Sequence, residues 1–385
     1  MAKFMAKSAR SPEVQSFHPH PKTLMGPGPS DVHPRVLQAL SRPTIGHLDP
    51  EFVRCMDEIK QLLQYAFQTE SALTLPVSGP GTAAMETCVV NLLEPGDTAV
   101  VCINGVFGQR IRQMVERCGA TAICLEQKWG EPVDPEQLET LLKKHPEASL
   151  VAFVHAETST GALSDAQTLA AIAQQYDCLT IVDAVTSLGG SPLYVDKWGL
   201  DAVYSGTQKC LSAPPGLAPL TLSKRAQERL RQRKTPVQSW FLDLSLVMNY
   251  WGENQQRTYH HTAPVNSLYA LHESLLMLKE EGLQQAWDRH YQNHKMLRQG
   301  LERLGIHFVV DKAYRLPQLN TVWVYEGFDD KEVRDYLLAH YHLEIGGGLG
   351  DFAGKAWRIG LMGYSSRQQN IEYCLEALAD ALSLA

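Results

Sequence analysis

The fold of this chain is best read from two stretches, Leu179-Thr-Ile-Val-Asp183-Ala-Val-Thr-Ser187 and Val203-Tyr-Ser-Gly-Thr-Gln-Lys209. Each begins with a short apolar run and ends in polar residues, a pattern typical of a strand buried inside a parallel sheet. Asp183 and Lys209 are 26 residues apart (209 − 183 = 26), which leaves room for one more strand between them. Ligands of such sheets bind beyond the carboxyl ends of the strands, so these two side chains are the first candidates for chemistry.

The same pattern extends outward on both sides of these stretches. Short apolar runs alternate with segments of helical periodicity between residues 71 and 222, and this order predicts an α/β fold with a mostly parallel sheet covered by helices. The expected strands are 73–77, 98–103, 121–125, 150–155, 179–183, 202–205 and 219–222. The expected helices include 52–67, 82–93, 108–118, 135–144 and 166–176.

The C-terminal third has a different organisation. Residues 264–303 predict long helices with a break near Gly282, and strand-like runs at 307–310, 321–325 and 356–361 alternate with helices at 331–340 and from Arg367 onward. We therefore expect a smaller C-terminal α+β domain, in which the glycine-rich segment 346–350 forms a mobile loop near Arg358. The predicted division is an N-terminal arm (1–22), a large domain (23–262), and an interdomain helix with the small domain (263–385).

Composition excludes several classes of partner. The 385 residues carry a formal net charge of −7, so no basic excess is present to bind nucleic acid, and no apolar run approaches the roughly 20 residues of a membrane span. The eight cysteines form no C-x-x-C pair, which indicates free thiols in a reducing, cytoplasmic setting. A faintly basic start to the chain leaves a transit peptide as the alternative. The pair His260-His261 has no third ligand in view, so we expect no metal site.

Lysine and aspartate at strand ends are suited to a particular cofactor chemistry. Burial and cationic neighbours lower the pKa of a lysine and make it a nucleophile toward aldehydes, although most lysines, taken alone, are solvated surface residues. A carboxylate at the end of a buried strand needs a cation, and the protonated ring nitrogen of pyridoxal phosphate would supply one. The alternative for Asp183 is a cap on the following segment.

A glycine-rich turn precedes both residues. Val77-Ser-Gly-Pro-Gly-Thr82 joins an expected strand to an expected helix, which is the arrangement that presents backbone N–H groups and a helix dipole to a phosphate. It matches neither the dinucleotide nor the Walker pattern, and a plain helix N-terminus with turn glycines explains the segment equally well.

Taken together, these motifs resemble those of class V, fold-type I pyridoxal-phosphate aminotransferases of the alanine–glyoxylate and serine–pyruvate type. Eight segments carry the resemblance, in family order from about residue 24 to the C-terminal helix: Met25-Gly-Pro-Gly-Pro-Ser30, Ser78-Gly-Pro-Gly81, Asn104-Gly-Val-Phe-Gly-Gln-Arg110, His155-Ala-Glu-Thr-Ser-Thr-Gly161, Val182-Asp-Ala-Val-Thr-Ser187, Ser205-Gly-Thr-Gln-Lys209, Tyr259-His-His-Thr262 and Trp357-Arg-Ile-Gly360. Insect 3-hydroxykynurenine transaminases are similar too.

The resemblance implies a role for each matching position. Lys209 would carry the cofactor as a Schiff base and act as the catalytic base, with Asp183 on the ring nitrogen. The other cofactor-binding positions would be Val185 and Phe107 on the two ring faces, Thr158 on the ring hydroxyl, Gly81, Thr82 and Gln208 on the phosphate, and Tyr259 and Thr262 reaching the phosphate from a second subunit. Arg358 would bind the substrate carboxylate, and Gly28 would lie on the substrate side. Many relatives of the alanine–glyoxylate type have Trp where Phe107 stands and His where Thr82 stands, which leaves those two contacts open.

The resemblance also implies the activity. A homodimer with shared active sites would move an amino group from a small amino acid, alanine or serine, to a 2-oxo acid, glyoxylate or pyruvate. The alternatives are a 3-hydroxykynurenine or kynurenine transaminase, or a class V lyase or desulfurase. A desulfurase needs a mobile loop cysteine, whereas Cys374 in the expected final helix is the only cysteine after Cys210. A catalytically idle binding subunit would not be expected to keep Lys209, Asp183 and Arg358.

Overall fold

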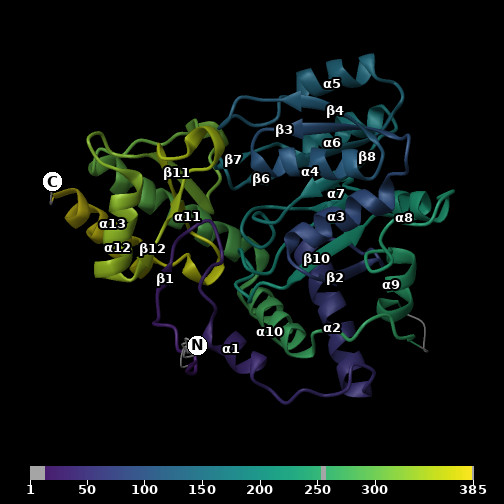
Figure 1. The fold of residues 1–385 in the computed structure, drawn as a ribbon, viewed down its shortest axis with the longest axis horizontal. Coiled ribbons are helices and arrows are strands. Elements are labelled where there is room, and N and C mark those ends of the chain that lie inside the picture. The colour runs from purple at the N-terminus through teal and green to yellow at the C-terminus, as the bar shows by residue number, and fades with distance from the viewer. Residues whose placement is uncertain (1–13, 253–256, 384–385) are drawn as a thin grey trace, which may run out of the picture.

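A central sheet organises the larger part of the molecule (Figure 1). The computed structural model describes residues 14–252 and 257–383, and within them seven strands pair in the order β2-β10-β9-β8-β5-β3-β4. β10 runs antiparallel to both of its neighbours and the other pairs are parallel, so the expected mostly parallel sheet is confirmed. The strands are β2 (Thr74–Ser78), β3 (Thr98–Ile103), β4 (Thr121–Glu126), β5 (Ala148–Val154), β8 (Leu179–Asp183), β9 (Ala202–Tyr204) and β10 (Leu217–Leu222).

Helices alternate with these strands along the chain and pack on the sheet. Several begin where the sequence provides a cap: Asp49 and Asp134 accept N–H groups of the first turn, and each is followed by a proline at the first helical position. The helices of this part are α2 (Pro50–Phe67), α3 (Gly81–Leu92), α4 (Val106–Arg117), α5 (Pro135–Lys144), α6 (Ala166–Gln175), α7 (Val195–Trp198), α8 (Lys224–Arg231), α9 (Leu244–Trp251) and α10 (Val265–Glu281). A short hairpin, β6 (Ala156–Glu157) with β7 (Ala162–Leu163), follows β5.

A second, smaller core is built by the C-terminal residues (Figure 1). Gly282 separates α10 from α11, as the sequence predicted. A three-stranded sheet, β11-β14-β13, packs with three helices. The elements are α11 (Leu283–Arg303), β11 (Leu319–Trp323), α12 (Asp330–Tyr341), β12 (Leu343–Glu344), β13 (Gly346–Gly347), β14 (Ala356–Gly360) and α13 (Gln368–Ser383).

Two expectations for the C-terminal part were wrong. Residues 307–310 form only one isolated bridge, Phe308 with Val322, because Asp311 then caps a 3-10 turn at Lys312–Tyr314 that bends the chain away. The glycine-rich segment is partly regular, since Gly346–Gly347 pairs with β14 as an edge strand and places Gly346 opposite Arg358.

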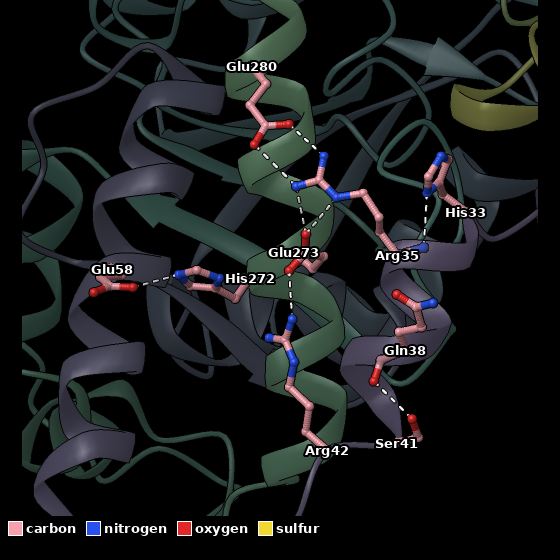
Figure 2. A network of polar contacts seen from close by, with 9 residues as sticks. All are labelled: His33, Arg35, Gln38, Ser41, Arg42, Glu58, His272, Glu273 and Glu280. Atoms are coloured by element: carbon pink, nitrogen blue, oxygen red, sulfur yellow. Dashed lines mark hydrogen bonds and ion pairs between the residues drawn. The ribbon is translucent and has the colours of Figure 1, made fainter.

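The N-terminal segment crosses from the small core to the large one. Residues 1–13 of the expected arm lie outside the described residues, and residues 14–22 are exposed and without regular structure. β1 (Thr23–Leu24) pairs with β12, and Met25 is buried in the small core. The chain then runs to α1 (Pro34–Leu40), which lies against α10 (Figure 2).

Ion pairs fasten α1 to α10 (Figure 2). Arg35 pairs with Glu273 at 2.8 Å and with Glu280 at 2.7 Å, and Arg42 pairs with Glu273 at 3.1 Å. The stretch 25–33 between β1 and α1 contacts the turn after β9, since the Ser30 N–H donates to the Gln208 carbonyl oxygen at 2.9 Å. The domain boundary expected between residues 262 and 263 stays a prediction. α10 and the start of α11 follow that boundary in the sequence but pack in the same core as the sheet.

Candidate active site

Lys209 lies in the turn after β9 and is held by the N-terminal segment. Its side chain is only 8% exposed, its Nζ donates to the carbonyl oxygen of Pro27, and its own carbonyl oxygen accepts from the Ser30 hydroxyl at 2.8 Å. Burial, and then the positive charge of Arg358, lower the pKa of Lys209 to about 8. At pH 7 about a tenth of the amine is therefore neutral, and so nucleophilic, which is far more than for a lysine of ordinary pKa.

Asp183 ends β8 and is 2% exposed. Its Oδ1 accepts from the Val185 N–H at 2.9 Å, and its Oδ2 accepts from the Tyr204 hydroxyl at 2.8 Å. Tyr204 stands opposite Asp183 in the β8–β9 register, which explains the contact. Burial raises the pKa of Asp183 to about 6 against the opposing effect of these hydrogen bonds. Within the described residues Asp183 has no ion-pair partner, so the site can accept a cation.

The turn between β2 and α3 forms a narrow cradle. A Cβ atom at Gly81 would lie 3.2 Å from Cγ2 of Val185 and 3.6 Å from the Ser205 carbonyl oxygen, so this approach suits glycine. No side chain caps the start of α3, which leaves N–H groups of its first turn open to an anion. Nearby, the buried side-chain oxygen of Gln208 has no hydrogen-bond partner in the part of the chain that the structure describes.

Arg358 approaches Lys209 from the small core. It lies in β14 and is 7% exposed, its Nε donates to the Gly347 carbonyl at 2.7 Å, and its Nη1 donates to the Thr158 carbonyl at 3.1 Å. Burial lowers the pKa of Arg358 to about 10. Carbonyl oxygens do not neutralise a guanidinium, and no carboxylate pairs with it among the described residues. A buried cation in this state is suited to a small carboxylate.

Glu157, next to Thr158, is a site residue to which the sequence assigned no role. Its fully buried carboxylate accepts from the Ser159 N–H at 3.0 Å, from the Ser159 hydroxyl at 2.6 Å and from the Phe107 N–H at 3.3 Å. Burial raises the pKa of Glu157 to about 7. The carboxylate thus caps the first turn of α4 and holds the expected stacking residue, Phe107, in place.

Tyr259 and Thr262 lie on the surface instead. Tyr259 is 61% exposed, and its hydroxyl lies 3.5 Å from that of Thr262. Neither side chain is hydrogen-bonded to Lys209, Asp183 or Thr82 within residues 14–252 and 257–383. The same stretch is tied to the cradle by the His261 ring, whose Nε2 lies 2.7 Å from the Ser78 hydroxyl.

The structure therefore groups the predicted residues in two sets. Hydrogen bonds, close packing and electrostatic interactions connect the first set: Gly28, Gly81, Asp183, Val185, Gln208, Lys209 and Arg358, with Thr158 beside Arg358, and Thr82 and Phe107 joined through Arg110. Tyr259 and Thr262 form the exposed set. Sequence reasoning missed Tyr204, Glu157 and Arg110. All three stood inside quoted segments without a role, and only the strand register could have indicated that Tyr204 contacts Asp183.

Comparisons with known proteins show what the chain as a whole is similar to. The family model of class-V aminotransferases matches residues 27–351. The alanine–glyoxylate aminotransferase of Oryctolagus cuniculus is 43% identical, over 94% of this chain and 93% of the relative, and the (S)-ureidoglycine–glyoxylate transaminase of Bacillus subtilis is 37% identical, over 94% and 90%. The crystal structure of an alanine–glyoxylate aminotransferase from Nostoc sp. superposes with a TM-score of 0.95 at 44% identity, covering 98% of this chain and 100% of that one.

Proposed function

This chain belongs to the class-V aminotransferases, and from that premise we propose that it transfers the amino group of alanine to glyoxylate. Membership makes it a pyridoxal-phosphate-dependent transaminase of fold-type I. Two relatives with different named donors, alanine and (S)-ureidoglycine, share glyoxylate as the named acceptor. We therefore assign glyoxylate as the acceptor, with alanine as the first donor and serine as the second.

The pocket fits pyridoxal phosphate. Asp183 is a buried carboxylate with no ion-pair partner in the described chain, and Lys209 is a buried amine of lowered pKa. Gly28 and Gly81 keep open the space that a Cβ atom would fill, since a Cβ at Gly28 would lie 2.7 Å from Nζ of Lys209. We propose that Lys209 holds the cofactor, with Asp183 at its ring nitrogen, Val185 and Phe107 at its faces, Thr158 at its hydroxyl, and Gly81, Thr82 and Gln208 at its phosphate.

The chain's own groups divide the work of the reaction. Pyridoxal phosphate, when bound, supplies an electron-withdrawing ring that stabilises negative charge at the Cα atom of the amino acid. Asp183 keeps a proton on the ring nitrogen because a buried carboxylate favours a cation beside it. Arg358 binds the substrate carboxylate and so orients the Cα–H bond. Lys209, whose amine has a pKa of about 8, accepts the proton from the Cα atom of the amino donor. In the half-reaction with the oxo acid, the same amine donates a proton to the Cα atom of the product.

The single observation that carries this proposal is the proximity of two buried cations that lack a carboxylate partner. The charge of Arg358 lowers the pKa of Lys209, so the two groups lie close enough to interact electrostatically; the guanidinium is suited to a carboxylate and the amine to a carbonyl. Reduction of the holoenzyme with borohydride and peptide mapping tests the amine, and we expect the label on Lys209. Label on another lysine would overturn the assignment.

A panel of donors against acceptors tests the substrates. We expect alanine with glyoxylate to give the highest kcat/KM, and serine to replace alanine more readily than 3-hydroxykynurenine does. A preference for 3-hydroxykynurenine would instead support the kynurenine-type alternative. Pyruvate as the better acceptor would contradict the assignment of glyoxylate.

We further propose a homodimer in the cytoplasm. Tyr259 and Thr262 are exposed in the single chain, so a second copy is the natural source of the pocket that they would complete. The cytoplasmic assignment is supported by the eight cysteines, all of them free and most of them buried. No helix in the described ranges is long and apolar enough to cross a membrane.

A further inference from the structure

Arg110 is a cation without a carboxylate partner beside the glycine cradle. It lies in α4, one turn after Phe107, and its Nη1 donates to the Thr82 hydroxyl oxygen at 3.1 Å. Its guanidinium carbon lies 5.1 Å from the centre of the Phe107 ring. A hydroxyl and an aromatic ring bind a guanidinium without cancelling its charge, and no carboxylate forms an ion pair with Arg110 in the described part of the chain.

The N-terminus of α3 adds positive potential at the same place. Thr82 is the second residue of this twelve-residue helix, which has no acidic residue in its first turn and no side-chain cap. An uncapped helix N-terminus carries roughly +0.5 of a charge. Arg110 thus reaches into a region that is already positive, which is unfavourable unless an anion lies there.

The two buried carboxylates of the site, Asp183 and Glu157, already accept hydrogen bonds from other groups. Asp183 accepts from Tyr204 and Val185, and Glu157 accepts from Ser159 and Phe107. Neither of them forms an ion pair with Arg110 in the described ranges, although the charge of Arg110 acts on Asp183 at longer range. No described carboxylate therefore contacts Arg110 at Thr82. A small, highly charged oxyanion bound at Thr82 would supply a direct partner for the guanidinium.

We propose that Arg110 is a binding residue for the phosphate group of the cofactor, which it meets beside Thr82. The proposal rests on the proposed function and adds a side-chain cation to a cradle otherwise made of N–H groups, a hydroxyl and an amide. Arg110 would donate to the phosphate through the N–H groups that Thr82 does not accept. The contacts with Phe107 and Thr82 orient the guanidinium.

The test compares pyridoxal phosphate with pyridoxal, which lacks the phosphate. Full-length protein is freed of cofactor by incubation with an amino donor and dialysis, and both ligands are titrated by absorbance. In Arg110→Gln, loss of a hydrogen bond to a charged group is expected to weaken pyridoxal phosphate binding roughly 10- to 100-fold. Pyridoxal affinity should stay within about twofold, because that ligand never meets Arg110.

Arg112 offers a matched control on the same helix. It pairs with Glu116 at the surface, at 2.9 Å, so Arg112→Gln should leave both affinities unchanged. Arg110→Lys keeps the charge and should regain part of the lost affinity, which also serves as the measurement if Arg110→Gln does not fold. Equal weakening of both ligands would show that Arg110 acts only through Phe107, and an unchanged pyridoxal phosphate affinity would place Arg110 outside the site; either result overturns the proposal. Failure of the proposed function would instead appear in the wild-type protein, as label on a lysine other than Lys209.

Discussion

Replacing Asp183 by asparagine is expected to stabilise the cofactor-free protein while removing its function. Burial raises the pKa of Asp183 to about 6, whereas the ordinary value is 3.8. The protonated acid is therefore favoured by the folded state, and the ionised carboxylate is disfavoured. Asparagine has nearly the same shape and carries no charge to bury. Its oxygen can accept from the Val185 N–H, and its NH2 group can donate to the Tyr204 hydroxyl, which rotates to accept.

The size of the effect follows from the shift in pKa. The shift is about two units, and one unit corresponds to 1.36 kcal/mol, so the ionised Asp183 costs about 3 kcal/mol of folding free energy. Below pH 3.8 the carboxyl is protonated in both states and the cost vanishes; it grows as the pH rises and is complete above pH 6. At pH 4.5 the cost is about 1 kcal/mol by the same linkage relation.

Urea unfolding of cofactor-free protein at pH 4.5, 6 and 8 measures this directly. The advantage of Asp183→Asn over the wild type should grow from about 1 to about 3 kcal/mol across this range. Asp134, which caps α5 near the surface, is a matched control, and Asp134→Asn should change stability by less than about 1 kcal/mol at each pH. With cofactor present the order should reverse, because the wild-type carboxylate then has its cation. A cofactor-free Asp183→Asn variant that is less stable than wild type at pH 8, or equally favoured at every pH, would refute the reasoning.

Three further experiments test the rest of the site. Arg358→Ala should lower kcat/KM of both half-reactions roughly 100- to 1000-fold and retain the cofactor absorbance, and Arg358→Lys should be only partly active. Single-turnover kinetics measure each half-reaction. Severe Lys209→Ala and Tyr259→Ala variants, each inactive alone, should regain partial activity when mixed, and a fully active monomer in sedimentation would contradict the shared site. Gly28→Ala should impair cofactor incorporation, since its Cβ would lie 2.7 Å from Nζ of Lys209, whereas Gly96→Ala, with a similar positive φ but open space around it, should incorporate cofactor normally.

Local sequence patterns were sufficient to predict the alternation of strands and helices. The strands 98–103 and 179–183 and the helix 135–144 were predicted with the bounds that the structure has, because apolar periodicity and caps are properties of neighbouring residues. The strand predicted at 307–310 was wrong. A strand needs a hydrogen-bonded partner along its length, and here the chain bends away after one bridge. Strand pairing depends on residues far away in the sequence, so an apolar run by itself does not predict it.

The same division runs through the candidate site. The sequence by itself determined that Asp183 ends a strand, that Lys209 follows the next strand, that a glycine turn opens α3, and that Arg358 lies in an apolar strand. Only the tertiary structure decided what those groups touch. The Pro27 carbonyl meets Lys209 across 182 positions of chain, and Arg110 reaches Thr82 from another helix. Such contacts depend on sheet register and on how two cores pack, which no local stretch of sequence encodes.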